Sequence, residues 1–247
     1  MTDTVLSLKG FLKPVLSNTS LFLYPSRCPV CDDPVWPVKA GICFSCMKKL
    51  KANAGAFCEK CGKKLIPGER ICHDCKTGDH VFERCRSAFE YGCISESLYR
   101  FKYLGRREYS GVYAKLALDV LGDYIYGIRP DAVTAVPLSR EKENKRGYNQ
   151  AYEFAKALSD LTDIPLLPDA VRRVKNTAPM KLLSPSERQK NLKNAFKSGE
   201  NVVKSKRILL VDDIYTTGAT MDACAEVLYG EGADSVYCLT ICSGAGI

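Results

Sequence analysis

Short apolar runs alternate with helical patterns along the second half of this chain. Residues 208–211 are four consecutive apolar residues, a run typical of a parallel strand that is covered on both faces. The pattern of residues 221–228 predicts a helix directly after it. Apolar residues also recur every four positions from Val112 to Tyr124, which predicts a helix that ends near Gly127. From about residue 87 onward, this alternation predicts a doubly wound α/β fold with a parallel sheet.

Two carboxylates and a hydroxyl-rich turn follow the run of residues 208–211. Asp212 and Asp213 come first, and the turn then consists of Thr216, Thr217, Gly218, Ala219 and Thr220. Glycine lets the backbone turn sharply and approach a ligand, and the threonine hydroxyls can donate hydrogen bonds to phosphate oxygens. The free N–H groups of the next helix also favour an anion. Because the two acids suit sugar hydroxyls rather than a bare phosphate, we expect a phosphosugar ligand.

A plain strand-to-helix turn with threonine caps is the alternative interpretation, but it gives two adjacent acids no role in packing. The segment resembles the fingerprint of the phosphoribosyltransferases, which bind phosphoribosyl pyrophosphate (PRPP) with such a strand, acid pair and threonine-rich loop. The resemblance implies a sheet of the type I phosphoribosyltransferase kind. It further implies that the 5′-phosphate lies on the loop, that Asp212 and Asp213 hold the ribose, and that Mg²⁺ accompanies PRPP.

A second strand is predicted over residues 131–136, where Pro137 closes it. The loop expected over residues 138–151 is basic and leaves the carboxyl end of this strand, where ligands of such sheets bind. It is therefore expected to meet the pyrophosphate of PRPP. The candidate pyrophosphate residues are Ser139, Arg140, Lys142, Lys145 and Arg146.

Four Cys-x-x-Cys pairs in the first part of the chain predict metal sites. Each pair can place two thiolates on one tetrahedral Zn²⁺, and a second pair closes the site, so that the zinc has a structural role. Sequential pairing gives a first site of Cys28, Cys31, Cys43 and Cys46, and a second of Cys58, Cys61, Cys72 and Cys75. An interleaved cross-brace stays open, and disulfides or an iron–sulfur cluster are less favoured alternatives. His73 lies inside the last pair and is expected to be a bystander.

The uneven placement of cysteine marks a domain boundary, since ten of the 13 cysteines lie between Cys28 and Cys93. We predict a short amphipathic helix over residues 1–25, a double zinc ribbon over 26–86 and a phosphoribosyltransferase-like domain over 87–247. No apolar run is long enough to span a membrane, and the N-terminus lacks a signal-peptide cleavage site. We therefore expect a cytoplasmic protein with reduced thiols.

Charge alone does not predict a nucleic-acid partner. The formal net charge is +8, but two Zn²⁺ held by eight thiolates would lower it by about four. Eight Lys or Arg residues do lie between Arg172 and Lys197, with Glu187 as the single acid. This stretch is either a solvated face or a surface for a polyanion. Within it, a mobile loop is expected over residues 176–183, and a capping box predicts a helix that starts at Ser184.

The chain resembles the ComF family well beyond the phosphoribosyltransferase loop. The matching features are the cysteine pairs, Phe101-Lys102-Tyr103 with Gly105-Arg106, the segment from Arg146 to Ala151, Arg173 and Thr177, Arg188, Asn191, Ala195 and Phe196, and the loop from Asp212 to Thr220. They cover most of the chain. One departure is Met180, which stands where the family usually has glutamine in the mobile loop.

This resemblance implies a PRPP-binding protein in which an acceptor attacks the anomeric carbon and pyrophosphate leaves. The ComF family is often labelled as amidophosphoribosyltransferase, but no glutaminase domain is evident, since a helix and two zinc sites account for the first 87 residues. The family is also associated with DNA uptake. The alternative is therefore a competence accessory protein that binds single-stranded DNA and other uptake proteins, with the PRPP site as sensor or vestige. Its candidate DNA contacts are Lys102, Tyr103 and Arg106.

Overall fold

The computed structural model forms two compact units, one up to Lys49 and one from Leu50. It describes residues 26–35, 41–53, 55–175, 192, 194–201, 203–204 and 206–244. Three predicted features lie outside these residues, namely the helix over residues 1–25, the loop with Met180 and the helix that starts at Ser184.

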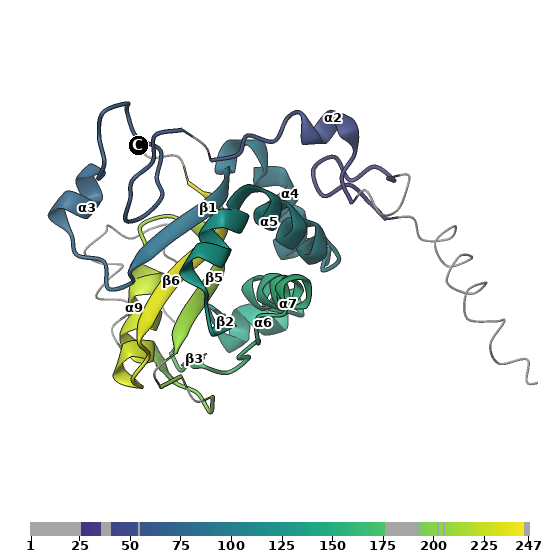
Figure 1. Cartoon of the computed structure of the whole chain (residues 1–247). Coiled ribbons are helices and arrows are strands. Elements are labelled where there is room, and N and C mark those ends of the chain that lie inside the picture. Colours follow the sequence, from purple (N-terminus) through teal and green to yellow (C-terminus); the bar gives the residue numbers. More distant parts are fainter. Residues whose placement is uncertain are drawn as a thin grey trace, which may run out of the picture. The chain divides into compact units, whose positions relative to one another are not determined.

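A four-stranded parallel sheet forms the centre of the second unit (Figure 1). The strands lie in the order β1-β6-β5-β2, and their bounds are Arg84–Glu90 for β1, Ala132–Ala135 for β2, Arg207–Tyr215 for β5 and Ser235–Ser243 for β6. All three neighbouring pairs are parallel. Parallel neighbours need long crossover connections, which the helices between the strands supply. The predicted parallel sheet is therefore confirmed.

Helices cover both faces of this sheet, as the alternation of strands and helices predicts. On one face, residues such as Leu209 and Val211 of β5 share a hydrophobic core with three helices, α4 (Ser95–Tyr103), α5 (Tyr109–Ile128) and α7 (Gln150–Thr162). On the other face, Ile208 and Leu210 share a core with α9 (Ala219–Gly230). Alternate residues of one strand thus belong to two hydrophobic cores, one on each face of the sheet, as in a doubly wound fold.

The smaller elements complete the second unit. Helix α3 spans His73–Thr77, and a 3-10 turn, η3, spans Tyr91–Cys93. Two short strands, β3 (Val171–Arg173) and β4 (Phe196–Ser198), form a separate antiparallel pair. In the first unit, helix α2 spans Phe44–Met47. Among the described helices, none combines the length and hydrophobicity that crossing a bilayer requires.

The prediction of a loop over residues 138–151 was wrong, because most of this segment is helical. Helix α6 spans Arg140–Arg146, with Ser139 as its N-cap and Gly147 in the left-handed region at φ 80° after its last turn. Acidic side chains lie in the first turn and basic ones in the last, an order that suits the helix dipole. The helix is charged along its whole length, so it lacks the apolar stripe by which sequence periodicity detects a helix.

The eight paired cysteines form two clusters in which the ligand atoms lie within 4.8 Å of one another. Cys28, Cys31, Cys43 and Cys46 form the first cluster, and Cys58, Cys61, Cys72 and Cys75 form the second. This grouping is the sequential one, and the exposed His73 is in neither cluster. Burial raises the pKa of the Cys61 thiol to about 12, so four thiolates in the second cluster need a cation to balance them. Four convergent sulfur ligands fit Zn²⁺, which prefers a closed tetrahedral site of this kind.

The second cysteine cluster belongs to the core of the sheet unit. Cys58, Cys61 and Cys72 share a buried cluster with Phe82, and residues of β5, β6 and α9 belong to the same cluster. The backbone N–H of Cys85, in β1, donates to the carbonyl of Lys60 over 2.7 Å. The second zinc knuckle is therefore built onto the sheet.

Loss of the second zinc should destabilise the sheet unit. We predict that Cys61→Ser lowers the free energy of unfolding by about 3 kcal/mol or more, since loss of a structural metal is among the few single changes with effects of that size. Metal analysis should show that the bound zinc falls by about half. Cys93→Ser is the control, because Cys93 lies outside both clusters. Equal stability and zinc content in the two variants would refute a structural zinc at Cys61.

Candidate functional site

The two acids lie near the carboxyl end of β5, one of the two central strands of the sheet. Asp213 is buried and accepts a hydrogen bond from Lys102 Nζ of α4 over 2.8 Å. Both side chains of this ion pair are less than one-fifth exposed. Although burial opposes it, the carboxylate of Asp213 raises the pKa of Lys102. The pair therefore places an ammonium group against a carboxyl group at the edge of the sheet.

Asp212 has a different environment from Asp213. Its Oδ1 accepts a hydrogen bond from the backbone N–H of Asp213 over 2.8 Å. Burial and the neighbouring Asp213 carboxylate raise the pKa of Asp212 to about 7, although Lys102 and Arg146 act in the opposite direction. A cation bound beside Asp212 would favour its carboxylate form. The charge of Asp212 therefore depends on whether a cation is bound beside it.

A tight turn connects the acids to α9. Gly218 is the N-cap of α9 and has φ 79°, in the left-handed region that favours glycine. Thr216 is exposed, while Thr217 and Thr220 are half-buried. A small hollow beside the turn is lined by Asp212, Tyr215, Thr216, Gly218 and Thr220, among others. Hydroxyl groups and the N-terminus of a twelve-residue helix therefore lie together at this hollow.

Basic side chains gather on the β2 side of the acids. A cleft of about 440 Å³ lies there, and its lining includes Arg140, Arg172 and Arg173 together with the acids Glu143 and Asp169. Burial lowers the pKa of the Lys142 ammonium, and the positive charges of Arg173 and Arg146 lower it further. These cations are thus close enough to repel one another, and a polyanion in the cleft would relieve that repulsion.

Arg146, the last residue of α6, connects this helix to α4. Its Nη1 donates to Gln150 Oε1 over 2.6 Å, and its Nη2 donates to the Tyr103 hydroxyl over 3.3 Å. The guanidinium also lies 4.9 Å from the centre of the Tyr103 ring. A planar cation fixed by three contacts is suited to bind oxyanions with two parallel hydrogen bonds.

Arg173 is the residue to which the sequence analysis gives no role in the site. It ends β3, lines the same cleft as Arg140, and interacts electrostatically with Asp212. Burial is the main cause of the lowered pKa of its guanidinium. The sequence signal for Arg173 was the cluster of Lys and Arg residues between Arg172 and Lys197. That cluster does not show which of its side chains lies near Asp212.

The remaining candidates divide between the site and the surface. Ser139 is buried, and its Oγ accepts from the backbone N–H of Lys142 as the cap of α6, while Arg140 and Lys145 are exposed. Of the three candidate DNA contacts, Lys102 lies in the acid site. Tyr103 is 51% exposed, and Arg106 lies 3.7 Å from a carboxylate oxygen of Glu108. Because its ammonium group is bonded to Asp213, Lys102 is not simply an external contact for DNA.

Two domain families match the chain. The double zinc ribbon domain matches residues 20–76, and the phosphoribosyl transferase domain matches residues 144–246. These matches agree with the two cysteine clusters and with the parallel sheet that carries the acid pair and its turn.

Curated relatives match over most of their length. Competence protein F of Haemophilus influenzae is 31% identical over 216 residues, which cover 85% of this chain and 93% of that protein. Competence protein ComFC of Bacillus subtilis is 30% identical over 81% of this chain and 83% of its own. DNA utilization protein YhgH of Escherichia coli is 29% identical over 88% of this chain and 97% of its own. The chain therefore belongs to the ComF family, in which a double zinc ribbon precedes a phosphoribosyltransferase-type domain.

Proposed function

We propose that this protein binds PRPP together with Mg²⁺ at the carboxyl edge of β5. One observation carries the proposal: Asp212 and Asp213 lie near the carboxyl end of a buried central strand, and a hydroxyl-rich turn at the N-terminus of α9 begins directly after that strand ends at Tyr215. The match to the phosphoribosyl transferase domain over residues 144–246 supports it. A sugar with a phosphate at one end and a pyrophosphate at the other suits this arrangement of acids, anion-binding turn and basic cleft.

Each part of the ligand then has its own protein partners. The turn from Thr216 to Thr220 binds the 5′-phosphate through hydroxyl and backbone donors. Asp212 and Asp213 accept hydrogen bonds from the ribose hydroxyls. Arg146 and Arg173, with Lys142, receive the pyrophosphate in the basic cleft.

The acid pair also fits Mg²⁺. This ion is commonly held by one or two carboxylates together with phosphate oxygens of the substrate, and Asp212 and Asp213 are the acids in place to hold it. When bound, the ion supplies positive charge that neutralises the pyrophosphate oxygens. The contact with Lys102 orients the carboxyl group of Asp213.

The residues also suit glycosyl transfer. As the bond between the anomeric carbon and pyrophosphate breaks, positive charge grows on the sugar and negative charge grows on the leaving group. The carboxylates of β5 lie on the sugar side, and the cations of α6 and β3 lie on the pyrophosphate side. Fixed charges of the right sign on both sides lower the barrier, because they need no rearrangement during the reaction.

The second candidate function is a role in DNA uptake, which the names of the competence relatives favour. Tyr103 is 51% exposed, its ring lies 5.1 Å from that of Tyr99, and Arg146 lies over it. Exposed aromatic rings beside a cation form a platform on which bases of single-stranded DNA can stack. Partner proteins of DNA uptake and a cytoplasmic location, where the thiols stay reduced, belong to the same proposal.

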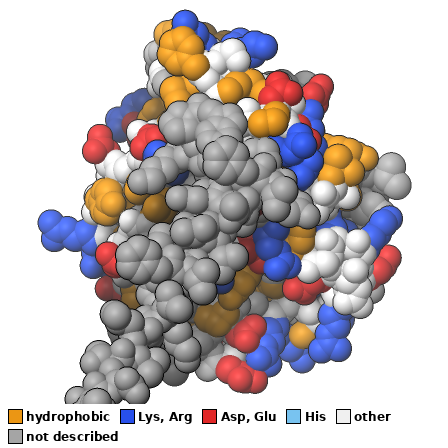
Figure 2. All heavy atoms as spheres, turned by 90° about the vertical axis from the view of Figure 1, so that its right-hand side faces the viewer, with side chains coloured by type: hydrophobic (Ala, Val, Ile, Leu, Met, Phe, Trp, Pro, Cys, Tyr) orange, Lys and Arg blue, Asp and Glu red, His pale blue; other side chains and the backbone are white. Residues whose placement is uncertain are grey.

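The charge distribution favours local stacking over a broad electrostatic surface. On the face shown in Figure 2, Lys and Arg side chains are interspersed with Asp and Glu. A mixed surface of this kind produces little long-range field. We therefore place any DNA contact at the Tyr99 and Tyr103 rings of α4, where stacking rather than a broad field would supply the affinity.

The PRPP proposal is tested by calorimetry with Mg²⁺ and PRPP. We expect the wild type to bind and the Asp212→Asn, Asp213→Asn double variant to show no measurable heat, because the amides neither attract the cation nor accept hydrogen bonds as carboxylates do. Thermal unfolding checks that the variant is folded. Absence of heat in the wild type would end the proposal. In the same samples, release of pyrophosphate with a panel of nitrogenous acceptors separates an enzyme from a sensor.

A second prediction concerns the buried ion pair. We predict that Lys102→Gln weakens Mg²⁺–PRPP binding by about tenfold or more, because it leaves Asp213 without its counter-ion in a buried position. Lys115→Gln is the matched control, since Lys115 is an exposed lysine of α5. Calorimetry measures both variants. Equal affinity in Lys102→Gln and the control would show that the ion pair has no part in the site.

The DNA proposal is tested by the salt dependence of binding to single-stranded DNA. The logarithm of the affinity should fall linearly with the logarithm of the salt concentration, by roughly 0.7 per phosphate contacted. Tyr103→Ala should weaken binding by roughly fivefold or more at fixed salt, since one base loses its stacking partner. Tyr126→Ala is the control, because Tyr126 is an exposed tyrosine of α5, on another helix. Lack of affinity at low salt would exclude direct DNA binding.

A further inference from the structure

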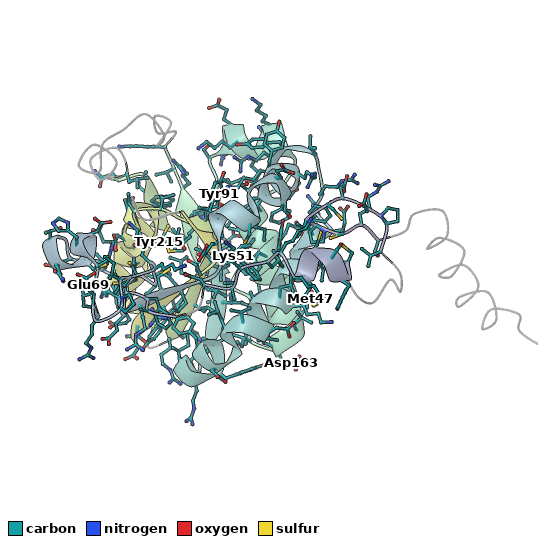
Figure 3. The ribbon with its side chains drawn as sticks, turned by 90° about the horizontal axis from the view of Figure 1, so that it is seen from above. Met47, Lys51, Glu69, Tyr91, Asp163 and Tyr215 are labelled. Carbon is teal, nitrogen blue, oxygen red and sulfur yellow. The ribbon has the colours of Figure 1, made fainter. Side chains whose placement is uncertain are left out.

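The residue before the phosphate turn reaches the second cysteine cluster. Tyr215 ends β5 and is 2% exposed; it is labelled in Figure 3. This hydroxyl lies 3.2 Å from His80 Nε2 and also interacts with the Cys61 thiol. A Cβ atom at Gly218 would lie 2.8 Å from the same hydroxyl. Tyr215 therefore contacts both the zinc ligand set and the glycine of the turn.

His80 makes the second connection. It follows α3, five residues after the last zinc ligand, Cys75, and its side chain is 10% exposed. Its ring is stacked on Phe82, with centroids 4.7 Å apart and planes at 19°. A Cβ at Gly218 would lie 2.7 Å from His80 Cε1, so the imidazole fills the space that glycine leaves. The ring is thus packed between the exit of the zinc knuckle and the turn.

The carboxylate of Asp222, in the first turn of α9, is held by the same segment. Its Oδ2 lies 2.8 Å from His80 Nδ1, and its Oδ1 accepts from the backbone N–H of Val81 over 2.8 Å. A carboxylate in the first turn of α9 would repel an anion bound at that N-terminus. The contacts with His80 and Val81 hold its oxygens toward the zinc module and supply its hydrogen bonds there.

We propose that His80 is a positioning residue that couples the second zinc site to the phosphate turn. Zinc fixes the knuckle, the knuckle fixes His80, and His80 holds Tyr215 before the turn and Asp222 after it. The inference rests on the proposed function, because it takes the turn from Thr216 to Thr220 to be the phosphate site.

The coupling has to act in both directions. If zinc orders the turn for an anion, then an anion on the turn must strengthen the hold on zinc by the same factor, since linked binding sites share one coupling free energy. Loss of the second zinc is therefore expected to weaken PRPP before the sheet itself unfolds. The proposal concerns the second cysteine cluster, which belongs to the same unit as the turn.

The test compares single variants of the full chain by calorimetry with Mg²⁺–PRPP and by zinc content. Tyr215→Phe and His80→Ala should weaken PRPP binding by roughly 5- to 50-fold, the range that loss of a buried hydrogen bond gives. His80→Asn keeps a donor near the position of Nδ1 and should recover part of the affinity. Tyr229→Phe is the matched control, because its hydroxyl bonds Glu83 and Val236 at the other end of α9. Zinc content should be the same in every variant.

Hydrogen exchange of the amides of residues 216–222 gives a readout that needs no PRPP. These amides should exchange faster in His80→Ala and Tyr215→Phe, while the amides of β5 and β6 stay protected. If His80→Ala does not fold, His80→Asn and Tyr215→Phe are smaller changes that test the same contacts. Unchanged exchange, or wild-type PRPP affinity in Tyr215→Phe, would overturn the coupling. A wild type that binds no PRPP, together with faster exchange in the variants, would instead overturn the proposed function and leave the coupling supported.

Discussion

Two adjacent carboxylates at the end of a buried strand are the constraint on which the rest of the site depends. Burying an acid costs free energy unless a cation or a set of donors compensates it. Asp213 is compensated by Lys102, and Asp212 by the backbone N–H of Asp213 and by the more distant charges of Arg146 and Arg173. The cations that stabilise the acid pair are therefore also the ones that would face the polyanion proposed as ligand.

The second zinc knuckle contributes to the site by completing the core on the α9 face. Three of its four cysteines are buried in the same cluster as Met221 and Cys224 of α9. The helix that begins at Gly218 is thus packed against a metal-stabilised loop. This packing explains how a small, polar stretch with little hydrophobic core of its own can support one side of the proposed ligand site.

Local patterns made much of this molecule predictable from sequence. The strand before Asp212, the turn at Gly218 and the four cysteine pairs each have a signature within about a dozen residues. The contacts that connect these segments have no such local signature, because Lys102 and Asp213 lie 111 residues apart in the sequence, and His80 and Asp222 lie 142 residues apart. Arg173 shows the same limit, since its basic neighbours gave no sign of which side chain turns toward the acids. Helix α6 was missed because it has no apolar stripe. Its caps and charged side chains stabilise it instead.

The strand order β1-β6-β5-β2 also has a consequence for how the chain folds during synthesis. The two strands made first, β1 and β2, lie at the two edges of the sheet, and both central strands come from the last fifth of the sequence. β2 cannot pair before β5 has been synthesised, and β1 cannot pair before β6, so a nascent chain that already carries its cysteine knuckles still exposes unpaired strands. Sheet formation must then close contacts between residues as far apart as Arg84 and Tyr237, and contacts of such long sequence separation slow folding.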